Sequence, residues 1–257
     1  MHMNEQYEKD GYFVVDSFFN AADTAQISEV VDKFHNLWTK ENQDFYRKKA
    51  INSAGLTGKK HLNYKDRNRL FELICSDGVA RVISSLPFSE PAFMTAQLFF
   101  NPVNHEQKNY WHRDPQYHLA EDEQKLAIQG AEVIHFRIAL ENEPGVELIP
   151  GTHRRWDTEE ELNIRLEKSG NKNHQSISSG VSIPLKKGDL LVFSANMIHR
   201  GLYGGKRKAL DILFCEGTPE LLEFINHDCL PDIEMLKNLD NPLIFSNSRG
   251  IGSETVV

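Results

Sequence analysis

A short stretch rich in histidine, YWHRDPQYH, spans residues 110–118. If its backbone is extended, His112 and Asp114 project from one face and Arg113 from the other, because alternate residues of a strand share a face. Two ligands of one metal ion need such a shared face. The spacing therefore favours a metal site over a polar loop that happens to contain histidines.

A third ligand has to come from another part of the chain, and the best candidate is His199. It ends the hydrophobic, strand-like run DLLVFSANMIH, and a jelly-roll can bring such a strand end beside the first pair. Two imidazoles and one carboxylate form the facial triad of non-haem Fe(II) oxygenases, which leaves metal positions open for a co-substrate and dioxygen. His112, Asp114 and His199 are the predicted catalytic metal ligands.

Arg207 is the next residue with a predicted role, because it follows His199 across the turn GLYGG. A guanidinium on the following strand can pair bidentately with the distal carboxylate of a keto acid that chelates the metal. His118 is expected to support the site rather than to bind the metal, since four protein ligands would block that chelation.

The ordered motifs resemble the phytanoyl-CoA dioxygenase family of Fe(II)/2-oxoglutarate oxygenases. They are DGYFVVDSFF, YWHRD, IAL followed by VELIPGTHR, GDLLVFSANMIHRG and RKAL. The resemblance implies that His112, Asp114 and His199 bind Fe(II). It also implies that Arg207 binds 2-oxoglutarate, and Gln97, in AFMTAQLFF, is a second candidate for binding this co-substrate.

The resemblance further implies the fold and the reaction. The expected fold is mainly β with covering helices, a double-stranded β-helix (jelly-roll) of the cupin type. With 2-oxoglutarate and dioxygen, such an enzyme hydroxylates a C–H bond of a small molecule. Asp114 favours hydroxylation over halogenation, because related halogenases carry a small residue there. Arg113 departs from the family, which commonly has Gln at this position.

Two other functions fit the same residues. One is a metal-dependent hydrolase or isomerase on a cupin-like fold, in which the triad binds zinc or manganese and activates water. The other is a non-catalytic sensor that binds 2-oxoglutarate without converting it. Arg207 argues against the hydrolase, which has no need to bind a keto acid.

Basic residues near the predicted pocket indicate the charge of the substrate. In GAEVIHFRIAL, period-two alternation puts His135 and Arg137 on one face and apolar residues on the other. Arg154, in PGTHRR, is a further candidate. These three residues are the predicted substrate contacts, and they predict an anionic substrate bearing a carboxylate or phosphate.

The elements that position these residues can be predicted from hydrophobic periodicity. Residues 20–40 are expected to form a helix capped by Asn20 or Asp23, and residues 67–86 a second helix. Strand-forming runs begin at about residue 91 and end at about 217, with a polar excursion at 154–180. We expect a single domain over 1–257, with a helical part at about 20–86 and a β-core at about 91–217.

Composition limits the partners. The net charge of −8 argues against nucleic acid or an anionic membrane as the main partner. No run approaches the ~18 apolar residues of a membrane span, and the start lacks the features of a leader peptide. The three cysteines have no CxxC spacing, as expected for reduced thiols. These features predict a cytoplasmic protein that acts on small molecules.

Overall fold

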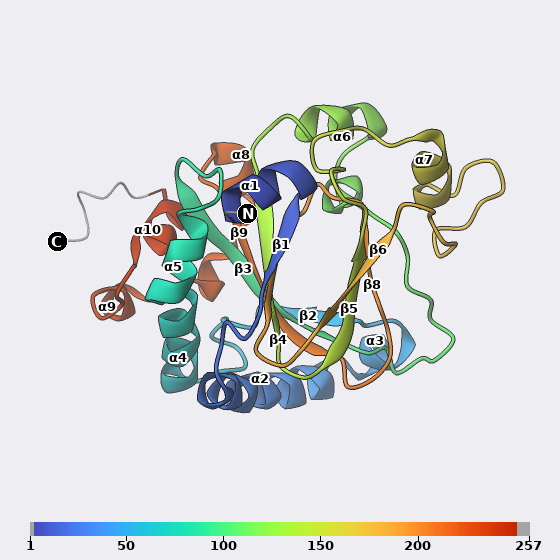
Figure 1. Cartoon of the computed structure of the whole chain (residues 1–257). Coiled ribbons are helices and arrows are strands. Elements are labelled where there is room, and N and C mark those ends of the chain that lie inside the picture. Colours follow the sequence, from blue (N-terminus) through green and yellow to red (C-terminus); the bar gives the residue numbers. More distant parts are fainter. Residues whose placement is uncertain (1–2, 251–257) are drawn as a thin grey trace.

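Two antiparallel sheets face each other at the centre of the computed structural model, which describes residues 3–250 (Figure 1). The strands are β1 (Tyr12–Val15), β2 (Asn52–Ala54), β3 (Pro91–Phe100), β4 (Val133–Ala139), β5 (Glu143–Leu148), β6 (Val181–Leu185), β7 (Leu190–Ser194), β8 (His199–Gly201) and β9 (Lys208–Glu216). The larger sheet has the order β1-β7-β4-β9-β3-β2, and the smaller has the order β6-β5-β8. The predicted fold, mainly β with covering helices, is confirmed.

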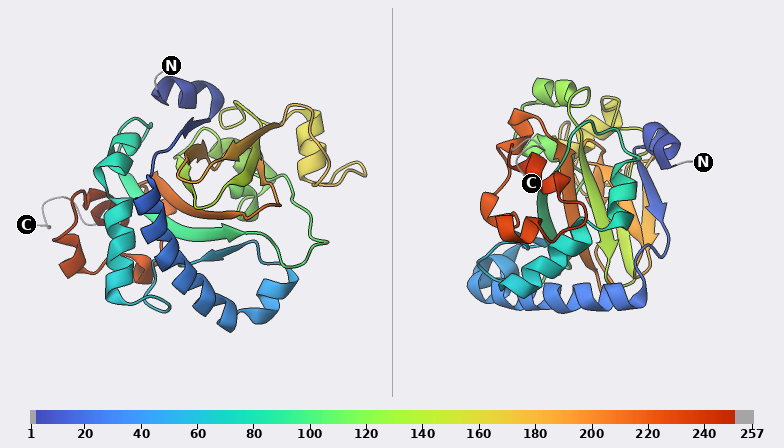
Figure 2. Two further views of the ribbon diagram at one scale, coloured as in Figure 1. Left: turned by 60° about the horizontal axis from the view of Figure 1, so that its bottom comes forward. Right: turned by 90° about the vertical axis from the view of Figure 1, so that its left-hand side faces the viewer.

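Helices lie outside and around the two sheets. They are α1 (Met3–Asp10), α2 (Ala21–Glu41), α3 (Gln43–Lys48), α4 (Tyr64–Ile74), α5 (Asp77–Ile83), α6 (Glu121–Ala127), α7 (Glu159–Arg165), α8 (Pro219–Leu222), α9 (Ile233–Leu236) and α10 (Leu243–Ser248), with 3-10 turns η1 (Asp114–Tyr117) and η2 (His227–Cys229). Figure 2 shows α2, α4 and α5 together on the outer side of the larger sheet. The opposite face of that sheet is therefore turned toward the smaller sheet.

The two faces of β4 show how the sequence divides the core. Ile134, Phe136 and Ile138 belong to the hydrophobic cluster that includes the buried faces of α2, α4 and α5. His135 and Arg137 line a cavity on the other face. The predicted alternation is confirmed, and it turns a polar face toward the space between the sheets.

The predicted helix at 20–40 is confirmed as α2. The Asn20 side chain accepts hydrogen bonds from the backbone N–H groups of Ala22 (2.8 Å) and Asp23 (3.0 Å), and the Asp23 carboxylate accepts one from the N–H of Asn20. This capping box satisfies donors that the first turn leaves free. Asn20 is thus the cap, and Asp23 completes the box.

The single helix predicted at 67–86 is wrong, because two helices, α4 and α5, occupy this stretch. Ser76 separates them with an extended backbone (φ −61°, ψ 152°) and occupies the cap position of α5. Ser followed by Asp is a favourable helix start, so it interrupts a continuous apolar periodicity.

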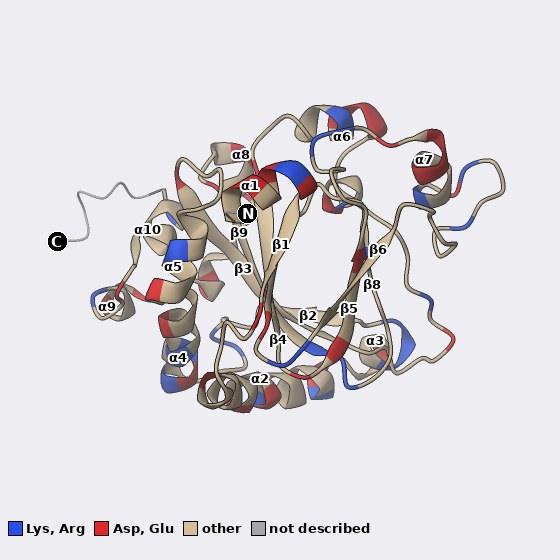
Figure 3. Ribbon diagram, viewed as in Figure 1, with Lys and Arg blue, Asp and Glu red and all other residues tan. Residues whose placement is uncertain are grey.

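Charged residues of both signs occur together on α4, α6 and α7 (Figure 3). The helix α7 also gives regular structure to part of the predicted excursion at 154–180. Within residues 3–250, no helix combines the length and the apolar character needed to cross a membrane.

Candidate metal centre and active site

His112 and His199 are held side by side by their own backbones. The N–H of each donates to the carbonyl of the other at 2.9 Å, forming an isolated antiparallel bridge. Their ring centroids lie 4.2 Å apart. Asp114 joins them because its N–H donates to the carbonyl of Ala195 (3.1 Å). His199 was predicted at a strand end, but it begins β8, after the turn that follows β7.

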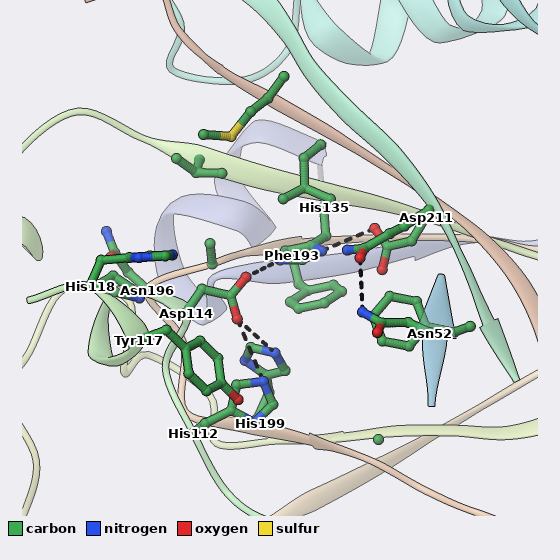
Figure 4. Close-up of a pocket in the computed structure, with 18 of the residues that line it drawn as sticks. Asn52, His112, Asp114, Tyr117, His118, His135, Phe193, Asn196, His199 and Asp211 are labelled. Atoms are coloured by element: carbon green, nitrogen blue, oxygen red, sulfur yellow. Dashed lines mark hydrogen bonds and ion pairs between the residues drawn. The ribbon is translucent and has the colours of Figure 1, made fainter. Parts of the chain in front are cut away.

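The three side chains converge on one point (Figure 4). Potential ligand atoms of His112, Asp114 and His199 all lie within 4.8 Å of one another. Asp114 Oδ1 is 3.5 Å from His112 Nε2 and 3.6 Å from His199 Nε2. The structure thus brings together the three residues that the sequence singled out.

Both imidazoles are arranged to offer Nε2 to a metal. Nδ1 of His112 lies 3.1 Å from the carbonyl of Tyr110, and Nδ1 of His199 lies 3.0 Å from that of Met197. We infer that Nδ1–H donates in each case, which leaves the lone pair of Nε2 free. Burial lowers the pKa of His112, and burial together with the neighbouring His112 lowers the pKa of His199 to about 3. Neutral imidazoles beside one carboxylate fit Fe(II).

His135 fixes the remaining oxygen of the acidic ligand. Its Nε2 lies 2.9 Å from Asp114 Oδ2, and its Nδ1 lies 3.0 Å from Asp211 Oδ1. Burial by itself lowers the pKa of His135, but Asp211 and Asp114 outweigh it and raise the pKa to about 10. The ring, stacked on Phe193 at 4.4 Å, therefore donates to both carboxylates. Asp114 Oδ1 is left facing the two histidines.

Arg137 also lines the cavity, but its charge is already compensated. Its Nε and Nη2 donate to the two Glu143 oxygens at 2.9 and 3.2 Å, and its Nη1 lies 3.8 Å from Asp211 Oδ2. Arg154 is not brought to the cavity. It pairs with Glu8, and both of these side chains are more than a third exposed.

Arg207 is buried in the same cavity and forms no ion pair with an acidic side chain of residues 3–250. Its Nη1 donates to the carbonyl of Phe100 (3.2 Å), and its Nε has no hydrogen-bond partner among the described residues. Burial and the nearby Arg137 lower its pKa to about 9. A Cβ on Gly201 would lie 2.3 Å from Nη2, so this glycine makes room for the guanidinium. A buried cation with a free donor fits a carboxylate ligand.

Gln97 lies in the cavity wall on β3, opposite Asp211 on β9. Its Oε1 accepts a hydrogen bond from Asn52 Nδ2 at 2.9 Å, which orients the amide. Asn52 comes from β2 and was not predicted. No local pattern in its short strand distinguishes it.

The sequence analysis missed aromatic residues that complete the cavity. The hydroxyl of Tyr117 donates to that of Tyr110 (3.1 Å), and both rings lie close to His112. Their positions on either side of His112 and Asp114 could have identified them in the sequence. Phe224, just beyond α8, lies outside the predicted β-core and packs against His118, with ring centroids 5.4 Å apart. His118 lines the cavity outside the metal triad, as expected.

Comparison with known proteins gives a family and a fold. The family model described as Phytanoyl-CoA dioxygenase (PhyH) matches residues 7–203. No curated protein matches the sequence.

Solved structures with similar folds cover most of this chain. AviO1 from Streptomyces viridochromogenes Tue57 has a TM-score of 0.56 at 16% identity, over 83% of this chain and 93% of its own. EctD from S. alaskensis, solved with 2-oxoglutarate and 5-hydroxyectoine, has a TM-score of 0.56 at 15% identity, over 83% and 74%. The epimerase SnoN, in complex with Fe3+, alpha ketoglutarate and nogalamycin RO, has a TM-score of 0.51 at 14% identity, over 84% and 83%. The similarity shows that the two sheets of this chain are arranged as in a jelly-roll fold, as predicted.

Proposed function

This chain belongs to the phytanoyl-CoA dioxygenase family, and on that basis we propose that it is an Fe(II)- and 2-oxoglutarate-dependent dioxygenase. The reaction we propose within that family is hydroxylation of one C–H bond of a small molecule. Dioxygen and 2-oxoglutarate would be consumed, and succinate, carbon dioxide and the hydroxylated product would be released.

The metal is assigned to His112, Asp114 and His199. Iron held by these residues would supply the activation of dioxygen that couples oxidative decarboxylation of 2-oxoglutarate to oxidation of the substrate. The chain's own contribution is to orient the ligands. Backbone carbonyls fix the tautomer of both histidines, and His135 fixes the carboxylate of Asp114.

The observation that carries the proposal is Arg207. A buried guanidinium with a free Nε, in the same cavity as the triad, lacks a charge partner that the distal carboxylate of 2-oxoglutarate would supply. Gln97, oriented by Asn52, is the proposed second contact of this co-substrate. A hydrolase that uses the triad to activate water would leave this arginine without a purpose.

The substrate contacts predicted from the sequence carry less weight. His135 and Arg137 line the cavity, but each is already bonded to carboxylates. A role in contacting the substrate stays a prediction for both residues. Arg154 has the weakest case, because it is paired with Glu8 away from the cavity.

The test is 2-oxoglutarate turnover by reconstituted protein. Purified chain is loaded anaerobically with Fe(II), and succinate is measured with each of Fe(II), 2-oxoglutarate and dioxygen omitted in turn. Succinate should form only when all three are present. The His199→Ala variant should lose this activity, because removing one ligand of a facial triad disrupts the site. The exposed His227→Ala variant is the matched control and should retain it.

A panel of small molecules then separates the reaction outcomes. Hydroxylation adds one oxygen atom from labelled dioxygen to the product, whereas epimerisation or ring closure adds none. Succinate formation without Fe(II), or full activity in His199→Ala, would rule out the proposed site. Tight binding of 2-oxoglutarate with no succinate for any compound would support the sensor instead.

A further inference from the structure

The cavity that contains the triad is larger than one co-substrate requires. Its volume is about 990 Å³, at the upper end of the ~300–1,000 Å³ that small-molecule sites usually span. 2-Oxoglutarate is a small dicarboxylate, and the space between the triad and Arg207 accounts for it. Figure 4 shows His118 and Asn196 on the opposite side of Asp114 from Asn52 and Asp211. The cavity therefore has a second end.

The inner face of the larger sheet changes character toward this second end. On β4 the side chains that line the cavity run from Arg137 through His135 to Val133, and on β9 from Asp211 to Leu213. Arg137 is opposite Asp211, and His135 is opposite Leu213. The charged pair Arg137 and Asp211 is thus followed, along the same strands, by His135 opposite the apolar Leu213 and then by Val133.

Segments beyond the sheet complete the apolar end. Leu119 and Ala127 line the cavity from the segment that leads into and forms α6, and Leu221 and Phe224 line it from α8 and the residues after it. The ring contact between Phe224 and His118 places the second segment beside the first. The apolar chamber is defined here as Leu119, Ala127, Val133, Leu213, Leu221 and Phe224.

The apolar chamber has no positive side chain of its own. Lysine and arginine side chains line the described cavity at Lys49, Arg137 and Arg207, and none of these is one of the six chamber residues. The nearby cation His135 is already bonded to Asp114 and Asp211. Arg137 is paired with Glu143, and Arg207 lies at the co-substrate end. The charged group that α8 adds to the lining is an acid, Glu220. An anion in the chamber would lose its hydration without gaining a lysine or arginine partner.

We propose that the apolar chamber binds an uncharged, largely hydrocarbon substrate. The inference rests on the proposed oxygenase function, because the chamber and Asp114 share one cavity and an apolar group there would present C–H bonds to the metal site. It departs from the anionic substrate predicted from the sequence. Of the three residues behind that prediction, Arg154 does not line the cavity, and His135 and Arg137 are already bonded to carboxylates.

Binding of a neutral dye tests the chamber without relying on turnover. N-phenylnaphthylamine, whose fluorescence rises in apolar surroundings, is titrated into the whole chain, first without metal and then with Mn(II) and 2-oxoglutarate. The dye is then displaced by decanol or by decanoate, which share a hydrocarbon chain and differ in charge. Decanol should act at a concentration at least about tenfold lower, because the carboxylate finds no cation there.

Two lysine substitutions test whether the dye binds in the apolar chamber. Phe224→Lys changes a half-exposed residue of the lining, and Leu119→Lys places a cation deeper. Both variants should weaken displacement by decanol and strengthen displacement by decanoate, reversing the preference. Leu243→Lys, at an exposed apolar position on α10 outside the cavity lining, is the matched control and should behave like the wild type.

The outcomes separate this inference from the proposed function. Equal potency of decanol and decanoate on the wild type, or no effect of either chamber variant, overturns the apolar chamber even if 2-oxoglutarate is still turned over. A decanol preference that both lysine variants reverse supports the chamber. If the wild type showed that decanol preference but formed no succinate from 2-oxoglutarate, the oxygenase function would be overturned and the chamber would stand.

Discussion

Two buried arginines, Arg113 and Arg207, differ in how their charge is compensated. Arg113 donates through Nε and Nη2 to Asp157 (3.0 and 2.8 Å), through Nη2 to the carbonyl of Arg155, and through Nη1 to the carbonyls of Thr152 and Asn196. Arg207 has one hydrogen bond, to a carbonyl, and a free Nε.

The difference separates an arginine that holds the fold from one that awaits a ligand. The desolvation of Arg113 is offset within the chain by Asp157, whose side chain is fully buried. In the described structure no carboxylate accepts a hydrogen bond from Arg207. Glu143 and Asp211 act on it only at longer range, and the rings of Phe99 and Tyr203 flank it, so its burial is compensated less than that of Arg113 until an anion binds. Arg113 lies between two metal ligands in sequence, yet it ties their loop to the segment around Asp157 rather than contacting the site.

The largest expected effect on stability comes from Arg113→Ala. Removing one partner of a buried ion pair typically costs about 3–5 kcal/mol. We expect the lower end of this range, because Arg165 still donates to Asp157 Oδ2 at 2.8 Å, whereas the carbonyls of Thr152, Arg155 and Asn196 lose their donor. The free energy of unfolding, measured by urea denaturation, should fall by about this amount. Arg113→Lys should recover only part of it, since an ammonium cannot reproduce the planar fork of donors.

The exposed ion pair of Arg154 with Glu8 provides the control for this variant. Arg154→Ala removes a surface pair and should change the free energy of unfolding by no more than about 1 kcal/mol. A loss as small as this in Arg113→Ala would mean that Arg113 does not hold the fold, and the comparison would fail on its structural side.

Arg207→Ala should produce the opposite result. Losing one member of a hydrogen-bonded charge pair costs about 2–5 kcal/mol of binding, so the dissociation constant of 2-oxoglutarate should rise roughly 30-fold to several-thousand-fold. The free energy of unfolding without ligand should stay the same or increase, because an uncompensated buried charge is removed. Calorimetric titration of 2-oxoglutarate into the Mn(II)-loaded protein measures the first quantity, and urea denaturation measures the second.

The two variants together decide the comparison. Arg113→Ala should bind 2-oxoglutarate normally in conditions where it remains folded. If Arg207→Ala instead destabilised the protein and left 2-oxoglutarate binding unchanged, Arg207 would be a structural residue, and the co-substrate would have to bind elsewhere.

Local sequence patterns predicted several residues that line the cavity, because the direction of each side chain depends on the conformation of the few residues around it. The same-face pair His112 and Asp114 follows from the two-residue period of an extended chain, and the cavity-facing pair His135 and Arg137 follows from the same period in β4. Arg207 was found from its place one turn after His199. In each case a few neighbouring residues determine the direction of the side chain.

Partners distant in sequence could not be predicted in this way. Asp157 lies 44 residues from Arg113, and only the folding of the excursion back onto the metal loop brings them together. The same holds for Phe224, which follows the last predicted strand and reaches the cavity through α8. The break at Ser76 was missed for another reason, because the apolar periodicity continues across it while the backbone turns extended there, although the Ser76 side chain makes no capping hydrogen bond.

A smaller effect is expected at His135, which links the metal ligand Asp114 to Asp211. Residues that orient a metal ligand typically contribute about 10- to 100-fold to metal affinity. His135→Leu should weaken Co(II) binding by this factor, measured from the absorption of the bound ion. His135→Gln should have a Co(II) affinity between those of the wild type and His135→Leu, because its amide can still donate to Asp114. The binding of 2-oxoglutarate at Arg207 gives a separate readout.

His118→Leu is the matched control for His135. His118 also lines the cavity but makes no hydrogen bond to Asp114 in the described structure, so its loss should leave Co(II) affinity unchanged. Equal weakening in both variants would show that the cavity as a whole, and not the contact with Asp114, determines metal binding.

The smallest effect extends the comparison to a histidine without compensation, His153. Its ring is buried against Tyr7, and neither nitrogen has a hydrogen-bond partner in the described part of the chain. Burial and the charges of Arg154 and Arg113 lower its pKa to about 4, and the opposing influence of Glu8 is smaller. Between the ordinary pKa of about 6.5 and this value, the unfolded chain binds a proton that the folded chain does not. Stability is therefore lost as the pH falls.

From about pH 7 to pH 5.5 this linkage should lower the free energy of unfolding by about 1 kcal/mol. His153→Leu, which keeps an apolar side chain among the same neighbours, should show a flatter dependence when urea denaturation is repeated across this range. His174→Leu, at an exposed position, is the matched control and should keep the wild-type slope. If the free energy of unfolding depended on pH identically in all three proteins, His153 would have a hydrogen-bond partner for its proton in the folded chain. Its burial would then be compensated, as that of His135 is.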